Sequence, residues 1–179
     1  AVARLLDDAG GLHGLLARTP RELADVAGVG EARAARLLAG AELGRRAAGR
    51  PLRRGRPFRS SRDVFRHYGP LLRDLVVEQF RVILLDGKHR VLHELLVSQG
   101  TLTSSPVHPR EVFGPAIRHA AAAVVLLHNH PSGDPTPSAD DLEVTRRLAD
   151  VGELVGIRVL DHVVLGDGAF ASLADRGLL

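Results

Sequence analysis

The 179-residue chain contains no cysteine and no methionine, and both absences limit what it can be. Without cysteine it cannot form disulfides, ligate Fe–S clusters through thiolates or use a thiol nucleophile. A closed structural zinc site is also disfavoured, because such sites usually include sulfur ligands. Because methionine is absent, Ala1 is not a translation start, and we expect the chain to be a fragment or a processed product.

Long apolar runs are absent as well. No stretch approaches the roughly 20 apolar residues that a membrane-spanning helix needs, and no signal-peptide pattern opens the chain. The sequence therefore predicts a cytoplasmic protein with no membrane partner, and it leaves the oligomeric state open. Hydrophobic residues make up 45% of the chain. This is enough for one core domain of about 110 to 120 residues and a small second domain.

The charge is distributed unevenly along the chain. Residues 1–62 contain thirteen arginines and six acidic residues, a net charge of +7, whereas residues 63–179 carry a net charge of −4. All basic residues except Lys88 are arginines, whose planar guanidinium suits phosphate. A preference for arginine codons would explain that ratio equally well, so the ratio alone assigns no function.

Residues 1–48 are predicted to form a small all-α domain. A short helix is expected after Thr19, because this N-cap residue is followed by Pro20 and by the capping-box residue Glu22. A longer helix is expected over residues 31–46. Its apolar stripe consists of Ala34, Leu37, Leu38 and Ala41.

The segment Gly28-Val29-Gly30 separates these two helices. The pattern Leu-x-x-Val-x-Gly-Val-Gly-x-x-x-Ala, which begins at Leu23, resembles the helix-hairpin-helix motif of DNA-binding proteins. Hairpin glycines let backbone N–H groups at a helix N-terminus approach a phosphate closely. The resemblance implies contact with DNA that does not depend on base sequence. The alternative is a hairpin that serves only packing or protein docking.

Residues 49–61 are rich in arginine, proline and glycine, a composition typical of a linker. The segment either extends a phosphate-binding surface or is a solvated connector, and the sequence favours neither.

Residues 62–179 alternate between helical and strand patterns, which predicts an α/β domain with a mixed sheet and packed helices. Helices are expected from Ser60 or Ser61 to about Leu75, over 109–121 and over 138–155. Strands are expected over 79–86, 89–97, 123–127, 157–165 and 169–172.

Two histidines and a carboxylate follow the apolar stretch 123–127. Because alternate side chains of an extended chain point to the same side, His128 and His130 can aim their rings at one point. Asp141 then returns from the start of the next helix. Imidazole nitrogens and a carboxylate oxygen are the ligands of a catalytic zinc site, which leaves a fourth position open for water. Ser138 and Asp141 also form an ordinary capping box, so it is the joint spacing that indicates a metal.

The spacing His128-x-His130-x7-Ser138-x2-Asp141 resembles the JAMM (JAB/MPN) metalloprotease motif. The longer sequence His-Asn-His-Pro-Ser-Gly-Asp-Pro is similar to the corresponding sequence in the bacterial branch of that family, the RadC-like proteins. Residues 107–113 and 161–165 are also similar to RadC-like proteins, so the resemblance covers nearly the whole chain. It implies a JAB/MPN, cytidine-deaminase-like fold, preceded by the helix-hairpin-helix domain.

The resemblance also implies roles for individual residues. His128, His130 and Asp141 would hold Zn²⁺, which lowers the pKa of its bound water toward about 7. Glu78, at the entry to a predicted strand, would act as general base and then as general acid. The alternative bases are Glu94 and Glu111.

We also predict supporting roles for other polar residues of the domain. Ser138 would donate a hydrogen bond to the tetrahedral oxyanion, in competition with its role as a helix cap. Asp134 would order the loop. His108 and His162 are predicted to be structural or to support the ligands, because three ligands suffice.

Two classes of function follow. The first is a zinc-dependent hydrolase, most directly a JAMM-type metallopeptidase or isopeptidase that uses a zinc-bound water and is localised to DNA by its N-terminal domain. The alternative is a DNA repair or recombination accessory protein, or a metal-dependent nuclease, which the arginine-rich N-terminal part and the family's traditional DNA-repair label favour. A two-metal nuclease needs more bridging carboxylates than Asp134, Asp140 and Asp141 provide, so we predict the peptide or isopeptide hydrolase.

Overall fold

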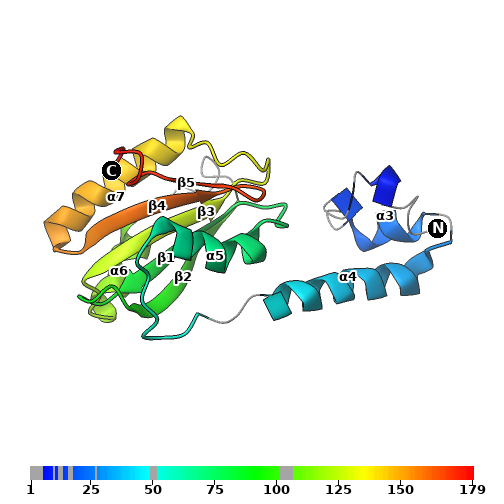
Figure 1. Cartoon of the computed structure of the whole chain (residues 1–179), viewed down its shortest axis with the longest axis horizontal. Helices are drawn as coiled ribbons and strands as arrows, with labels where there is room; N and C mark the ends of the chain where they lie inside the picture. The colour runs from blue at the N-terminus through cyan, green and yellow to red at the C-terminus, as the bar shows by residue number, and fades with distance from the viewer. Residues whose placement is uncertain are drawn as a thin grey trace.

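The structure is a computed structural model that describes residues 6–9, 11, 14–15, 18–26, 28–48, 52–100 and 107–179. In chain order its main elements are α3 (Pro20–Ala24), α4 (Gly30–Ala48), α5 (Ser61–Leu72), β1 (Gln79–Leu85), β2 (Val91–Gln99), α6 (Pro109–Arg118), β3 (Ala123–Asn129), α7 (Ala139–Val155), β4 (Arg158–Leu165) and β5 (Phe170–Ser172). Figure 1 shows these elements along the chain. Among the described residues, no helix combines the length and the apolar character needed to cross a membrane.

The described strands form a mixed sheet in the order β2-β1-β3-β4-β5. β1 pairs antiparallel with both β2 and β3, β3 pairs parallel with β4, and β4 pairs antiparallel with β5. A parallel pair needs a crossover connection, which α7 provides between β3 and β4. The predicted α/β class, with a mixed sheet and packed helices, is confirmed.

Helices cover both faces of this sheet (Figure 1). Alternate residues of β1 point into opposite layers. Phe80, Val82 and Leu84 pack beneath α6 and α7, whereas Ile83 and Leu85 pack beneath α5. β3 is buried along all seven of its residues and forms the centre of the core.

Most predicted elements in this domain are displaced by only a few residues. β3 continues through Asn129 instead of ending at residue 127, because Asn129 still pairs with Leu165 of β4. β2 begins at Val91, since His89 takes a positive φ of 55° in the turn after β1. α6 ends before residue 121, because Ala120 also takes a positive φ of 49°.

The described part of the predicted linker, residues 52–60, is attached to the sheet domain. Phe58 is buried beneath α5, and its N–H donates to the His89 carbonyl at 3.1 Å. The Gly55 N–H donates to the Val91 carbonyl at 2.8 Å. A solvated connector is therefore the wrong description of this part, because one aromatic side chain and the edge of β2 fix it in place.

The helices α3 and α4 pack against one another around a small core of their own. Leu23 is fully buried and Ala34 is almost fully buried. Leu37, expected on the apolar stripe, is 41% exposed, so the stripe is narrower than predicted. Between the helices, Gly28 and Gly30 take positive φ values of 85° and 62°, a backbone conformation that glycine adopts without strain.

Candidate metal centre

The end of β3 brings two imidazole rings together. His128 pairs with Phe80 of β1, and the next residue but one, His130, donates its N–H to the Leu165 carbonyl at 2.8 Å. The backbone is therefore still extended at His130, and alternation directs both rings to the same side. Their Nε2 atoms are 2.9 Å apart.

The first turn of α7 brings in a carboxylate. The hydroxyl of Ser138, the N-cap, accepts the Asp141 N–H at 3.2 Å, and Asp141 Oδ2 accepts the Ser138 N–H at 2.7 Å. This reciprocal capping box fixes the Asp141 side chain. Its Oδ1 lies 3.0 Å from His128 Nε2, and its Oδ2 lies 3.3 Å from His130 Nε2.

Glu78 joins the group from the residue before β1. Its Oε1 is 3.8 Å from His128 Nε2. One ligand atom from each of Glu78, His128, His130 and Asp141 lies within 4.8 Å of the others. The side chains of His128 and Asp141 are buried, whereas those of Glu78 and His130 are 14% and 17% exposed. The cluster can therefore hold a metal ion that a small molecule could still reach from one side.

A chain of hydrogen bonds determines which nitrogen of His128 carries its proton. The Thr145 hydroxyl donates to the Asp141 backbone carbonyl, so its oxygen is left to accept from His162 Nδ1. Burial lowers the pKa of His162 well below its usual value, which keeps this ring neutral. Its Nε2 must then accept from His128 Nδ1, 2.8 Å away. His128 is therefore left with an Nε2 lone pair that faces the cluster.

His130 is oriented in the same way by the loop that follows it. Its Nδ1 lies 2.8 Å from the Asp134 carbonyl, which can only accept, so Nδ1 carries the proton. Two Nε2 lone pairs and a carboxylate therefore meet at one point, where the buried Asp141 Oδ1 has no hydrogen-bond partner among the described residues. The two lone pairs and the carboxylate repel one another unless a cation, either a proton or a metal ion, lies between them. The donor set fits a metal ion such as zinc.

The pKa shifts in the cluster also indicate that a cation is stabilised beside Asp141. Burial raises the pKa of Asp141. When a proton and not a metal ion lies between the groups, hydrogen bonds from His128 and His130 outweigh burial and hold this pKa well below its usual range. The hydrogen bond with Asp141 in turn raises the pKa of His130. The carboxylate is thus ionised, and positive charge is stabilised beside it.

The structure gives different positions to the residues that were predicted to support the site, His162, His108 and Asp134. His162 contacts His128 directly, whereas His108 caps α6, where its Nδ1 accepts the Arg110 N–H at 3.3 Å. The Asp134 side chain accepts hydrogen bonds from the N–H and the hydroxyl of Thr136, at 2.9 and 2.7 Å, and so orders the loop.

Of the three candidate glutamates, the structure brings only Glu78 to the histidines. Glu94 forms an ion pair with Arg81 on the sheet. Glu111 forms one with Arg110 at 3.0 Å on α6. Neither belongs to the cluster that the described residues form.

Sequence reasoning missed two buried residues that organise the cluster, Asn129 and Thr145. Asn129 Oδ1 accepts the Gln79 N–H at 2.9 Å, and its amide group donates to the Val77 carbonyl at 3.3 Å. These two bonds hold the backbone on both sides of Glu78. The only local signal for Asn129 was a polar side chain at the end of an apolar strand, since its partners are 50 and 52 residues away.

Comparison with known proteins identifies the family. The family model described as the RadC-like JAB domain matches residues 58–178, which contain the whole sheet and the whole cluster. The chain belongs to the RadC-like JAB domain family. The RadC-like JAB domain thus begins at Phe58, the residue that anchors the segment before α5 in the core.

Relatives of this RadC-like protein cover both of its parts. A UPF0758 protein of Syntrophotalea carbinolica is 51% identical over 168 residues, which are 94% of this chain and 74% of the relative. One from Geotalea uraniireducens is 47% identical over 175 residues, 98% of this chain and 77% of the relative. One from Symbiobacterium thermophilum is 51% identical over 174 residues, 97% of this chain and 74% of the relative.

Proposed function

We propose that this protein is a metal-dependent hydrolase, and more specifically a zinc metallopeptidase or isopeptidase of the JAMM type. The observation that carries the proposal is the convergence of two imidazole Nε2 lone pairs and an ionised carboxylate beside Glu78. Three nitrogen and oxygen ligands with an open side are typical of catalytic zinc sites, whereas structural sites are closed.

The chain supplies the ligands and the proton transfer. Zn²⁺, when bound by His128, His130 and Asp141, supplies a Lewis acid and a water of lowered pKa. Glu78 Oε1, 3.8 Å from His128 Nε2, is close enough to take a proton from the attacking water and to return it to the leaving amine.

Ser138 is the proposed donor to the oxyanion. Its hydroxyl donates to Asp141 Oδ2 at 2.7 Å, so its single proton has to leave this acceptor before it can serve the substrate. The capping interaction with the Asp141 N–H uses a lone pair and can persist through that change.

A two-metal nuclease is the less favoured candidate. A second ion would need bridging carboxylates beyond Glu78 and Asp141. Asp134 accepts a hydrogen bond from the Thr136 hydroxyl, and Asp140 is exposed. Neither belongs to the cluster found among the described residues.

The experiment that tests the function pairs metal analysis with cleavage assays. Zinc-loaded protein is incubated with a peptide library, with an isopeptide-linked dipeptide and with single- and double-stranded DNA, each with and without a chelator. We expect chelator-sensitive cleavage of an amide substrate and none of DNA. Chelator-sensitive cleavage of DNA alone would contradict the peptidase proposal.

DNA binding through the N-terminal helices is a separate proposal. It is supported by the two glycines of positive φ just before and at the start of α4, Gly28 and Gly30. The net charge of +7 over residues 1–62 adds to this support, although residues 1–51 contribute only +2 of it and residues 52–62 contribute +5. Because Phe58 belongs to the core of the sheet domain, the shortened chain that tests it has to begin near Leu52. We expect this chain to retain metal and to lose affinity for duplex DNA, measured by fluorescence anisotropy.

The full chain should bind duplex DNA with little sequence preference, and its affinity should fall steeply as salt rises, because counterion release supplies the free energy. Equal affinity of the full and shortened chains would assign α3 and α4 to packing or to protein docking. An affinity for DNA that does not change between low and physiological salt would likewise contradict DNA binding through phosphate contacts.

A further inference from the structure

The outer edge of β2 is only partly covered. The Gly55 N–H donates to the Val91 carbonyl at 2.8 Å, and the Val91 N–H donates to the Arg56 carbonyl at 2.9 Å, so the incoming segment covers the first residue of the strand. Within the described part of the chain, no strand pairs with this edge over residues 92–99. Edge strands are commonly protected by proline, lysine or β-bulges. This nine-residue strand contains neither proline nor lysine, but its register with β1 shifts at Leu92 and at Val97, so residues 93–96 are its regular stretch.

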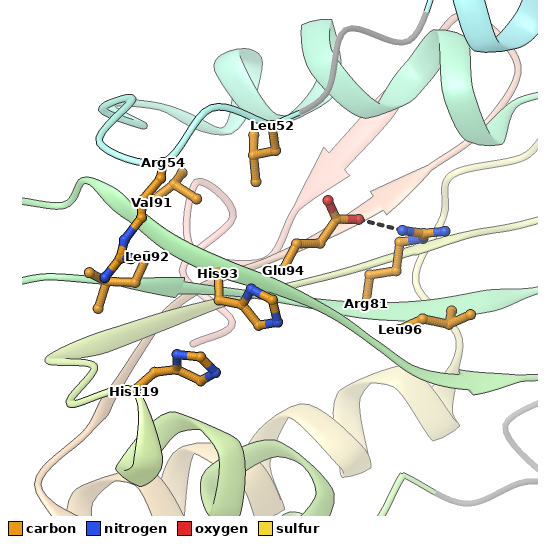
Figure 2. A pocket seen from close by; sticks show the side chains of 9 residues that line it. All are labelled: Leu52, Arg54, Arg81, Val91, Leu92, His93, Glu94, Leu96 and His119. Atoms are coloured by element: carbon orange, nitrogen blue, oxygen red, sulfur yellow. Dashed lines mark hydrogen bonds and ion pairs between the residues drawn. The ribbon is translucent and has the colours of Figure 1, made fainter.

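A pocket of about 590 Å³ opens along this uncovered edge. Figure 2 shows Arg54 reaching across the strand toward Leu92, and His93 and His119 facing one another. The two imidazole rings stack with centroids 4.6 Å apart. Leu96, 48% exposed, adds an apolar surface farther along the strand.

The charges of this pocket favour an acidic ligand. Among the described residues that line it, Glu94 is the only acidic one, and Glu94 forms an ion pair with Arg81. Arg54 is exposed and adds a positive charge that no lining carboxylate offsets. His93 and His119 add ring N–H donors beside it. A carboxylate on the ligand would complement these three side chains.

β2 also leads from this pocket to the candidate metal centre. Gln99 pairs with Gln79, and the Gly100 N–H donates to the Glu78 carbonyl at 2.9 Å. From His93 to Gln99 a strand rises roughly 20 Å, at about 3.3 Å per residue. An extended chain of six to eight residues lying on this edge would therefore run from the pocket to the end of β2. Glu78, just before the start of the adjacent strand β1, is two strand spacings from such a chain, or about 10 Å, so roughly three or four further residues would cross the end of the sheet to reach it.

We propose that an extended acidic peptide adds to β2 as a further strand and is guided along it to the metal centre. Its backbone pairs with the regular stretch of the edge, residues 93–96, and its carboxylates meet Arg54, His93 and His119. Strand addition gains affinity from main-chain hydrogen bonds and specificity from side-chain pockets. A nucleic acid would match the charge but could not complete the strand edge. The inference rests on the peptidase function proposed above and adds its substrate class, a peptide with acidic residues roughly ten positions from the cleaved bond.

The test measures binding without cleavage, in the zinc-loaded Glu78→Gln protein, by fluorescence anisotropy. The probe is a fluorescein-labelled peptide of eight residues with alternating valine and glutamate. Two matched probes carry glutamine for glutamate, or N-methyl groups on alternate amides. We expect the acidic probe to bind at least about tenfold more tightly than either matched probe, since the first lacks the charge and the second lacks the backbone donors.

Arg54→Glu should weaken binding of the acidic probe by about tenfold or more, whereas the matched control Arg146→Glu, at an exposed position of α7, should leave it unchanged. Equal loss in both variants, or undiminished binding of the N-methylated probe, would overturn the proposal.

Displacement of the acidic probe by a single-stranded oligonucleotide that binds Arg54→Glu more weakly would assign the pocket to phosphate instead. If the acidic probe binds to the β2 edge but the protein cleaves no amide, the peptidase function is contradicted and the docking surface on β2 is supported. Amide cleavage with an unchanged KM in Arg54→Glu would contradict the docking surface alone.

Discussion

Substituting both His128 and His130 by alanine should lower the metal content of the purified protein from about one ion per chain to none. The two Nε2 lone pairs, 2.9 Å apart, are the neutral donors of the cluster, and their loss would leave Asp141 as the only one of the three proposed ligands. Elemental analysis of protein equilibrated with zinc measures the change directly.

The matched control for this experiment is the second histidine pair of the domain. His93 and His119 stack on one another beside β2 and do not belong to the cluster, so the His93→Ala/His119→Ala protein should keep its metal. Full metal occupancy in the His128→Ala/His130→Ala protein would refute the assignment of the ligands.

Glu78→Gln should leave the metal bound and lower amide-hydrolysis turnover by about 10² or more, because glutamine cannot take up and return a proton. Glu78 Oε1 is 3.8 Å from His128 Nε2, whereas Asp141 Oδ1 is 3.0 Å from the same atom, so the glutamate lies farther from the imidazole than the proposed ligand does. Single-turnover kinetics and elemental analysis of the same sample separate the two effects.

Glu111→Gln is the matched control, because this exposed glutamate pairs with Arg110 on α6, away from the cluster. Asn129→Ala keeps the Glu78 carboxylate but removes both bonds that hold its backbone, so turnover should fall with the metal retained. Metal loss in Glu78→Gln would make Glu78 a ligand, and unchanged turnover would assign the base to another residue.

The local parts of the cluster were predictable from the sequence. An apolar strand that ends in His-x-His specifies the direction of both rings, and Ser138-x-x-Asp141 specifies the first turn of a helix, since both patterns act over a few residues. The fold class followed from the same alternation of strand and helix patterns.

The parts that could not be predicted depend on residues distant in the sequence. The His162 contact with His128 spans 34 residues, and the Asn129 contact with Gln79 spans 50. Periodicity predicts which face a residue occupies but not which strand will lie beside it. The burial of Phe58 was missed for a similar reason, because its neighbours in the core come from α5 and the sheet, while its own segment has the composition of a linker.

The antiparallel register of β1 and β3 determines how much change in length the protein can tolerate. Phe80 lies opposite His128, so an insertion or deletion of one residue between positions 79 and 85 would move Glu78 by about 3.3 Å and turn its side chain to the other face of the sheet. The turn between β1 and β2, residues 86–90, lies at the far end of the same strand, where added residues do not alter this spacing. In this family, natural variation in length should therefore concentrate at that turn and spare the first strand.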